Sequence, residues 1–351
     1  MRTTILSILA IAAVAAMIFA FRDEIKREFI FATESPEQGS AGLDSDEIES
    51  GDIEVIAENL EIPWDIVWLP EGGMLVTERP GRLRLIDGDR QVFDIGGVQH
   101  IGEGGLLGMR LHPDFENNRW LYIYMTTGGS DNTSNRVVRY HFQGNELTDE
   151  KVIIDNIPGA RYHNGGRIEF GPDGKLYITT GDAGNWEHAQ DKNSPAGKIL
   201  RLNDDGSVPE DNPFGNAVWT WGHRNPQGIT WDDRGRMWST EHGRSGLKSG
   251  LDELNLIRKG KNYGWKIIQG YEDKPGMVPP VLMSGPDYTW APASAMWMDG
   301  SVFFGGLRGE ALYEAVIVSS DSARLKTHLY NEYGRIRTVR EGPDGWIWFT
   351  T

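Results

Sequence analysis

Short apolar runs and turn residues alternate along the chain from about residue 60 onward, and no long stretch there repeats at the spacing of a helix. In each unit an apolar run meets a turn rich in Pro, Asp and Gly, and a second run rich in aromatic residues follows. Pro presets the first turn dihedral and Gly takes the left-handed position, so each unit predicts a β-hairpin. The paired strands are expected at residues 66–69 and 74–76, 108–111 and 121–124, 168–170 and 176–178, 229–231 and 237–239, 295–297 and 302–304, and 339–340 and 346–349.

The repeat of this unit decides the expected fold. Its six copies lie roughly 40 to 65 residues apart, a spacing typical of propeller blades with loop insertions. The 44 glycines and 13 tryptophans agree with many short strands and tight turns. We therefore expect an all-β, six-bladed β-propeller over residues 53–351. The alternative is a β-sandwich, which does not need a repeated strand–turn–strand unit.

The N-terminal region has a different composition. Arg2 precedes an apolar run over residues 5–21, and charged residues follow at 22–28. The run has the form of a signal sequence and also reaches the lower length limit of a membrane-spanning helix. We expect a hydrophobic helix at residues 1–22, either a signal peptide or a membrane anchor. Residues 23–52, acidic and rich in Ser and Gly, are expected to form a disordered tether.

Composition limits the function. A formal net charge of −16 argues against nucleic-acid binding, which requires a basic surface. The chain has no cysteine, so redox chemistry would have to come from a bound cofactor. The N-terminal run predicts a periplasmic or other extracytoplasmic location, with attachment to the inner membrane if the helix is retained.

Six motifs stand in order at residues 102–108, 162–167, 222–228, 241–243, 252–255 with 262–265, and 334–337. Together they resemble the soluble glucose/sorbosone dehydrogenases that depend on pyrroloquinoline quinone (PQQ), including the aldose sugar dehydrogenases. The resemblance implies a quinoprotein oxidoreductase with PQQ and calcium as cofactors. It also implies oxidation of an aldose at C1 to its lactone and transfer of electrons to an exported acceptor.

His163 stands in a loop that leads into an expected strand, where a neutral imidazole could accept the proton of a sugar hydroxyl. The resemblance implies that His163 is the general base and that Asp182 orients it. On the residues alone, a hydrogen-bonding loop His and a turn Asp remain the alternatives.

Arginines are the expected cofactor ligands, because PQQ carries three carboxylates. Arg335 and Arg337 stand at i and i+2, which would place both on one face of a strand and allow bidentate pairing with carboxylates. Arg308 is a third candidate ligand of the PQQ carboxylates, with a weaker basis than the pair. The resemblance also assigns Arg224 and Asn225 to PQQ, where they would stabilise negative charge on a quinone oxygen.

The remaining assignments rest on the resemblance. Glu103 is expected to contact the cofactor, and Trp290 is either a stacking partner of PQQ or a core residue. The backbone carbonyls of Gly243 and Arg244 are expected to bind the calcium that activates PQQ. A second, structural calcium would use Glu253 and the main chain at Tyr263, since calcium prefers oxygen ligands.

The chain departs from the family pattern at two places. Arg244 replaces a usual Pro, and the loop over residues 244–250 is longer than usual. The second departure is at the C-terminal end, where the last expected hairpin stops at Thr351 and the usual further loop and strand do not follow. Either the sequence is a fragment, or a strand near residues 53–56 alone completes the last blade.

Two other functions stay open on the sequence. A calcium-dependent propeller lactonase would need several side-chain carboxylates around a central calcium, and the pair Arg335 and Arg337 counts against it. A non-catalytic propeller that binds a carbohydrate or a protein is the other alternative.

Overall fold

The computed structural model describes residues 53–88, 90–129, 132–143, 146–246 and 249–351. The helix expected at residues 1–22 and the tether expected at residues 23–52 lie outside this part of the chain. Among the helices in the described part, none is long and apolar enough to cross a membrane.

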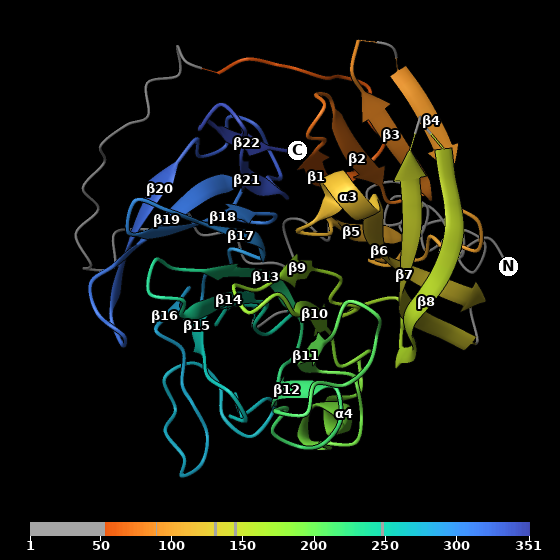
Figure 1. Cartoon of the computed structure of the whole chain (residues 1–351). Helices are drawn as coiled ribbons and strands as arrows, with labels where there is room; N and C mark the ends of the chain where they lie inside the picture. The colour runs from red at the N-terminus through yellow and green to blue at the C-terminus, as the bar shows by residue number, and fades with distance from the viewer. Residues whose placement is uncertain (1–52, 89, 130–131, 144–145, 247–248) are drawn as a thin grey trace, which may run out of the picture.

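The described chain folds into five four-stranded antiparallel sheets and one two-stranded sheet, which stand around a common axis (Figure 1). The first sheet is β1 (Pro63–Trp68), β2 (Met74–Glu78), β3 (Arg82–Ile86) and β4 (Arg90–Asp94). The second is β5 (Leu106–Leu111), β6 (Trp120–Gly129), β7 (Asn132–Gln143) and β8 (Glu146–Pro158). The third is β9 (Ile168–Phe170), β10 (Leu176–Thr180), β11 (Lys198–Leu202) and β12 (Val218–Trp221).

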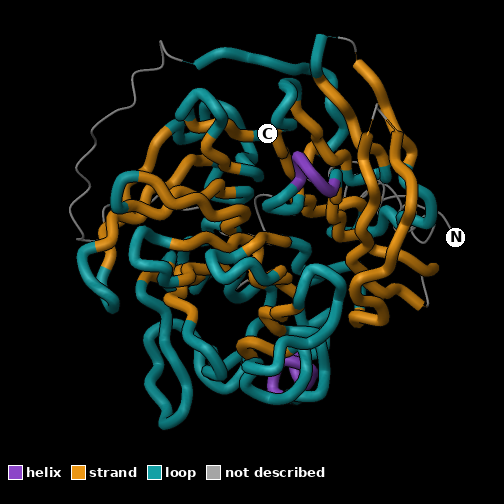
Figure 2. Tube along the Cα trace, viewed as in Figure 1, coloured by secondary structure: helices purple, strands orange, loops and turns teal. Residues whose placement is uncertain are grey.

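The fourth sheet is β13 (Pro226–Trp231), β14 (Met237–Glu241), β15 (Glu253–Ile257) and β16 (Leu282–Met283). The fifth is β17 (Pro292–Met298), β18 (Ser301–Gly306), β19 (Ala311–Ile317) and β20 (Ala323–His328), and β21 (Val339–Glu341) with β22 (Ile347–Phe349) forms the last. Two short helices, α3 (Phe115–Asn118) and α4 (Trp186–Gln190), lie in connections between strands (Figure 2). This arrangement is a β-propeller, and a β-sandwich is ruled out.

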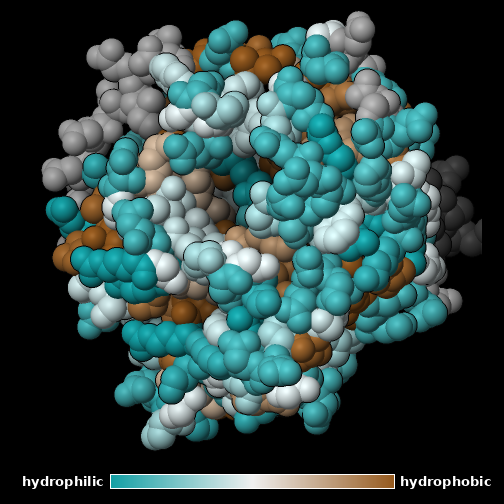
Figure 3. Space-filling view, in the orientation of Figure 1, coloured by the Kyte–Doolittle hydropathy of each residue, from teal (hydrophilic) through white to brown (hydrophobic). Residues whose placement is uncertain are grey.

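All six predicted hairpins are present as antiparallel pairs, from β1–β2 to β21–β22. They are the inner two strands of each sheet, and successive first strands contact one another around the axis. The outer strands were not predicted. The space-filling view shows a hollow near the centre of this ring (Figure 3).

Clusters of buried apolar side chains lie between neighbouring sheets and form the core. The smallest cluster in the described structure joins the first sheet to the last, with three buried members, Ile66, Met74 and Val76. Trp68 and Trp348 add an edge-to-face contact there, with ring centroids 5.6 Å apart. Apolar packing is therefore thinnest where the ring closes.

The last sheet has two strands in the described structure, and residues 53–60 form no strand beside it. The expectation that a strand near residues 53–56 completes this sheet is wrong for the described chain. Asn59 (φ 62°) and Ile62 (φ 52°) adopt left-handed backbone conformations that interrupt an extended path. Residues 53–60 instead line a groove of about 710 Å³ together with β22.

Polar contacts close the ring at this thin interface. Arg340 in β21 forms a bidentate pair with Asp65 in β1, in which Nη2 lies 2.8 Å from Oδ1 and 3.0 Å from Oδ2. Thr338 Oγ1 donates to the Trp64 carbonyl, which is a second direct link between the first and last sheets. Asp65 and Arg340 are both buried.

The Asp65–Arg340 pair belongs to a larger buried network. Asp65 Oδ2 also lies 2.8 Å from Arg167 Nη1, and Glu169 pairs with both Arg340 and Arg110. Burial alone would raise the pKa of Asp65, but the guanidinium groups of Arg167 and Arg340 lower it below the ordinary value. The network joins β1, β5, β21 and the segment that enters β9, so charge pairing holds four sheets together at the axis.

Arg340→Met should destabilise the protein by about 3–5 kcal/mol, because it leaves the carboxylates of Asp65 and Glu169 buried with less compensation. Urea denaturation measures the change, and Arg324→Met, on an exposed position of β20, is the matched control with a change within about 0.5 kcal/mol. A loss below about 1 kcal/mol for Arg340→Met would show that the ion network is not what closes the ring.

Candidate active site

A cavity of about 570 Å³ opens where loops from several blades meet. Most of the residues expected from the sequence to form a site line it. They are Glu103, His163, Arg224, Asn225, Gly243, Arg244, Arg308, Arg335 and Arg337. Segments more than 200 residues apart in sequence thus contribute side chains to one cavity.

His163 and Asp182 form the pair that the sequence predicted. His163 lies in the loop between β8 and β9, and Asp182 follows β10 by two residues. His163 Nδ1 lies 2.7 Å from Asp182 Oδ1, so Nδ1–H donates to the carboxylate and Nε2 is left as an acceptor. Burial alone would raise the pKa of Asp182, but the hydrogen bonds from His163 and the Gly184 N–H lower it.

The backbone around His163 is held closely. His163 has a φ of 60°, an uncommon conformation for a residue with a side chain, and its N–H donates to Glu103 Oε2 at 2.8 Å. Gly181 packs against it, since a Cβ at that position would lie 2.0 Å from the His163 carbonyl oxygen. Glu103 therefore positions the loop that carries His163 and also faces the cavity.

Arg224 and Asn225 enter the cavity from the loop between β12 and β13. The Arg224 Nη2 donates to Ser245 Oγ at 2.7 Å, and the guanidinium carbon lies 5.3 Å from the centre of the Trp265 ring. Asn225 Oδ1 accepts from the Gly165 N–H at 3.0 Å. Its buried Nδ2 has no partner among the described residues, which leaves a donor available to a ligand.

The other arginines give the cavity a positive character. Arg335 and Arg337 reach it from an extended segment just before β21, so the expectation that they stand on a strand is wrong, although they do face the same cavity. Arg79, which follows β2, lines it as well. Burial, with the nearby charges of Arg335 and Arg79, lowers the pKa of Arg337 to about 9. The cavity is thus suited to an anionic ligand in a chain of net charge −16.

The loop that carries Gly243 and Arg244 borders the same cavity. Gly243 N–H donates to the buried Asp252 Oδ1 at 2.7 Å, which fixes the start of the loop. Arg244 and Gly250 exchange two backbone hydrogen bonds, in which the Gly250 N–H approaches the Arg244 carbonyl at 3.3 Å. Arg244 Nη2 donates to the Pro286 carbonyl at 3.0 Å. The Arg244 carbonyl also accepts from Ser249 Oγ at 3.4 Å, so it already has two donors within the loop, and a cation at this oxygen would have to displace one of them.

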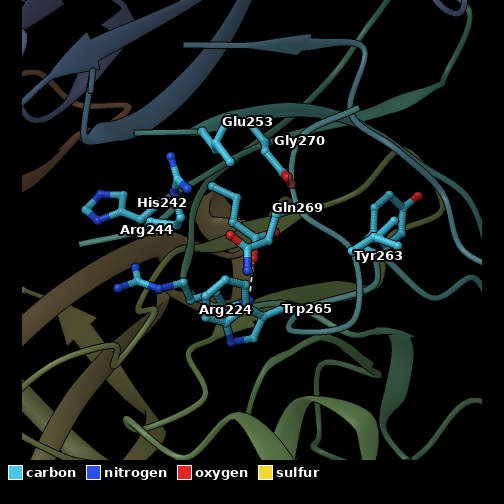
Figure 4. Close-up of a pocket in the computed structure, with 12 residues that line it drawn as sticks. Arg224, His242, Arg244, Glu253, Tyr263, Trp265, Gln269 and Gly270 are labelled. Carbon is cyan, nitrogen blue, oxygen red and sulfur yellow. Dashed lines mark hydrogen bonds between the residues drawn. The ribbon is translucent and has the colours of Figure 1, made fainter. Parts of the chain in front are cut away.

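Glu253 and Tyr263 lie at a second, much smaller cavity of about 10 Å³, beside Arg224 and Trp265 (Figure 4). Burial and the neighbouring Glu241 carboxylate raise the pKa of Glu253 to about 8. Glu253 Oε2 accepts from Asn255 Nδ2 at 3.1 Å. Across the described residues, no group of three or more His, Cys, Asp or Glu side chains could hold a metal, so a cation here would depend on backbone oxygens.

Comparison with known proteins decides the family. Residues 60–351 match the family described as Glucose / Sorbosone dehydrogenase. The chain belongs to the glucose/sorbosone dehydrogenase family. Members of this family that resemble it include the aldose sugar dehydrogenase YliI of Escherichia coli, 31% identical over 85% of this chain and 89% of that protein.

Two further relatives are described by their cofactor. The quinoprotein glucose dehydrogenase B of Acinetobacter calcoaceticus is 35% identical over 65% of this chain, and the match spans 55% of that longer protein. The PQQ-bound aldose sugar dehydrogenase of Streptomyces coelicolor has a similar structure, with a TM-score of 0.78 and 36% identity over 85% of this chain and 90% of that one.

Sequence reasoning missed three site residues of this dehydrogenase. Arg79 follows a strand without any motif of its own, and Trp265 stands in the motif at residues 262–265 but is one of 13 tryptophans. The ring of His242 donates through Nε2 to the Pro292 carbonyl at 2.9 Å; burial and the charge of Arg224 lower the pKa of His242 to about 3. Trp290 is a core residue, packed against Phe304 and Tyr313, so it does not serve as a stacking partner in the cavity.

Arg337→Met should raise the melting temperature of the ligand-free dehydrogenase by a few degrees at pH 7, because it removes a partly buried cation that faces other guanidinium groups. Its contact with Trp64, with 5.5 Å from guanidinium carbon to ring centre, offsets only part of this cost. Folding lowers the pKa of Arg337 to about 9, and such a base costs stability at every pH below its pKa in the folded protein. Because pH 6 and pH 8 both lie below about 9, the gain in melting temperature should be equal at the two pH values.

Scanning calorimetry with and without citrate, a small tricarboxylate, measures both the stability and the anion response. Citrate should raise the melting temperature of the unsubstituted protein more than it raises that of Arg337→Met. Arg324→Met should match the unsubstituted protein with and without citrate. A lower melting temperature for ligand-free Arg337→Met would contradict the unfavourable charge environment assigned to Arg337.

Proposed function

We propose that this chain oxidises an aldose at C1 to its lactone with PQQ as the cofactor. The observation that carries the proposal is His163, held by Asp182 with its Nε2 free to accept a proton, in a cavity lined by arginines. Family membership and the cofactor named for the Streptomyces coelicolor and Acinetobacter calcoaceticus proteins support the choice of PQQ.

The residues present fit such a cofactor. Three carboxylates require several cations, and Arg79, Arg335 and Arg337 supply them at one cavity, with Arg308 beside them. The unpartnered Asn225 Nδ2 offers a donor to a quinone oxygen. A volume of about 570 Å³ lies within the usual range for a cofactor site. When bound, PQQ supplies the electron-pair acceptor that takes the hydride from C1 of the sugar.

The protein's own groups perform the proton transfer. His163 Nε2 takes the proton of the C1 hydroxyl as the hydride departs, so that the C1–O bond becomes the lactone carbonyl. Asp182 holds Nδ1–H, which fixes the tautomer and stabilises the imidazolium that forms. Arg224, buried and fixed by Ser245, would supply the positive charge that stabilises negative charge on a bound cofactor.

We propose that calcium binds at two places. The carbonyls of Gly243 and Arg244 would hold one ion beside the cofactor, where it would polarise the quinone. Glu253 and the main chain at Tyr263 would hold the other. The raised pKa of Glu253, caused by burial and by Glu241, supports the second site, because a buried carboxylate with an acidic neighbour favours a bound cation.

We propose that β21 and β22 are the inner strands of a sixth blade. Their position between the fifth sheet and the first, and the contact of β21 with β17, support this blade count. We also propose that the enzyme acts outside the cytoplasm and passes electrons to an exported acceptor. The apolar run at residues 5–21, whether a signal peptide or an anchor to the inner membrane, supports export.

The two alternative functions are less well supported. A lactonase needs a central calcium held by several carboxylates, and the described residues contain no such acidic cluster. A purely binding propeller would not need the His163–Asp182 pair or the unusual backbone of His163.

The first test is dye reduction by the purified chain reconstituted with PQQ and calcium. Aldoses should be oxidised only when PQQ is present, and His163→Ala should lower kcat by about 10²- to 10⁴-fold because the proton acceptor is lost. PQQ affinity of that variant should stay within about threefold, and His141→Ala, in β7, is the matched control. Absence of PQQ binding at micromolar concentration would reject the cofactor, and a near-native kcat for His163→Ala would reject the base.

Calcium should raise the melting temperature of the apoprotein, and magnesium should do so less, because the smaller ion loses its water reluctantly. Glu253→Gln should remove most of the calcium-dependent rise, whereas Asp321→Asn, on an exposed turn, should leave it intact. An unchanged calcium response in Glu253→Gln would place the ion elsewhere.

A further inference from the structure

Trp265 contacts both charged groups on which the proposed reaction depends. Its indole Nε1–H donates to Asp182 Oδ2 at 2.8 Å. The same ring lies against the guanidinium of Arg224, with 5.3 Å between the guanidinium carbon and the ring centre. Figure 4 shows Trp265 and Arg224 side by side at the small cavity. One rigid side chain thus links the carboxylate behind His163 to the cation that faces the cofactor site.

The backbone of Trp265 is fixed from two sides. Its N–H donates to the Gly222 carbonyl at 2.9 Å, on the loop that leads to Arg224. Its carbonyl accepts from Gln190 Nε2 at 2.5 Å, at the end of α4, and α4 follows Asp182 closely in sequence. The ring is therefore anchored to the two loops whose side chains it touches. An indole with one donor and few rotamers is well suited to hold them in register.

The two oxygens of Asp182 have separate donors. Oδ1 accepts from His163 Nδ1–H at 2.7 Å and from the Gly184 N–H at 2.8 Å, while Oδ2 accepts from Trp265. Asp182 is buried, so an unsatisfied Oδ2 would be costly and the carboxylate would turn to find another donor. A turn of the carboxylate would move Oδ1 and misalign the His163 ring.

We infer that Trp265 is a positioning residue, which orients the Asp182 carboxylate toward His163 and holds Arg224 at the same time. The inference rests on the proposed role of His163 as the general base. It assigns to Trp265 a function in proton transfer that acts through Asp182 and not through contact with the sugar.

The pH dependence of activity distinguishes this role from simple packing. The titratable and charged groups around His163 are Asp182 behind it, Glu103 at its backbone, and Arg224 and His242 from the next blade. The indole N–H helps to lower the pKa of Asp182. Without it the carboxylate holds the Nδ1 proton more strongly, and the imidazolium persists to higher pH. The acidic limb of the kcat/KM profile should then move to higher pH.

Trp265→Phe, made in the full chain reconstituted with PQQ and calcium, keeps a ring over Arg224 but lacks the donor. We expect kcat to fall about tenfold, a loss of one hydrogen bond to a charged group, with PQQ affinity changed less than threefold. The acidic limb should shift upward as argued. Trp297→Phe is the matched control, because it removes an indole donor to Asp233 at an exposed site and should change neither quantity.

A double-variant cycle completes the test. If Trp265 acts through Asp182, Trp265→Phe should add little to the loss already caused by Asp182→Asn. Fully additive losses, or a reduced kcat with an unmoved acidic limb, would overturn the inference. An active His163→Ala would instead reject the proposed base, whatever Trp265 does. Should Trp265→Phe not fold, Gln190→Ala, which frees the Trp265 carbonyl, should show the same upward shift to a smaller extent, and no shift would again overturn it.

Discussion

Asp65 and Arg340 meet where the first and last sheets of the propeller come together, and the apolar cluster there is the smallest in the described part of the ring. A buried pair of charges is a weak source of net stability when compared with apolar packing, but breaking it is costly. Such a contact therefore contributes little net stability but favours the one arrangement in which the ring is closed. Closure at this interface keeps the two terminal sheets covered, because a propeller opened there would expose one face of each.

Closure and the active site share the same short segments. Asp65 follows Trp64, whose ring contacts the guanidinium groups of Arg167 and Arg337. Arg337 stands three residues before Arg340, so one segment supplies an arginine to the cavity and another to the axis. Because Arg337 and Arg340 stand on one segment, closure of the ring also places Arg337 at the cavity. Trp265 likewise joins the loops that carry Asp182 and Arg224.

The sequence predicted the inner hairpins because their turns carry Pro, Asp and Gly at positions with a local physical meaning. The outer strands lack that signal, and β16 with two residues has almost none. His163, Asp182 and the arginines were found through motifs, since no periodicity places residues 163 and 337 in one cavity. Arg79 and the Trp265–Asp182 contact were not predicted, because both depend on long-range packing. The strand expected near residues 53–56 is absent from the described structure, where these residues line the groove beside β22 instead of pairing with it.

Buried charges have different roles at the propeller axis and in the cavity. At the axis each carboxylate has guanidinium partners, and the pKa of Asp65 is lowered despite burial. In the cavity the arginines face one another, the pKa of Arg337 falls to about 9, and a buried Asn225 donor has no partner among the described residues. A guanidinium among other guanidiniums, as at Arg337, and a buried donor without a partner, as at Asn225, cost stability in the empty protein and become favourable with an anionic ligand that supplies acceptors. The axis network still contains an Arg167 Nη2 without a hydrogen-bond partner among the described residues and adds little net stability, so the apolar clusters between the sheets offset the cost of the positively charged cavity.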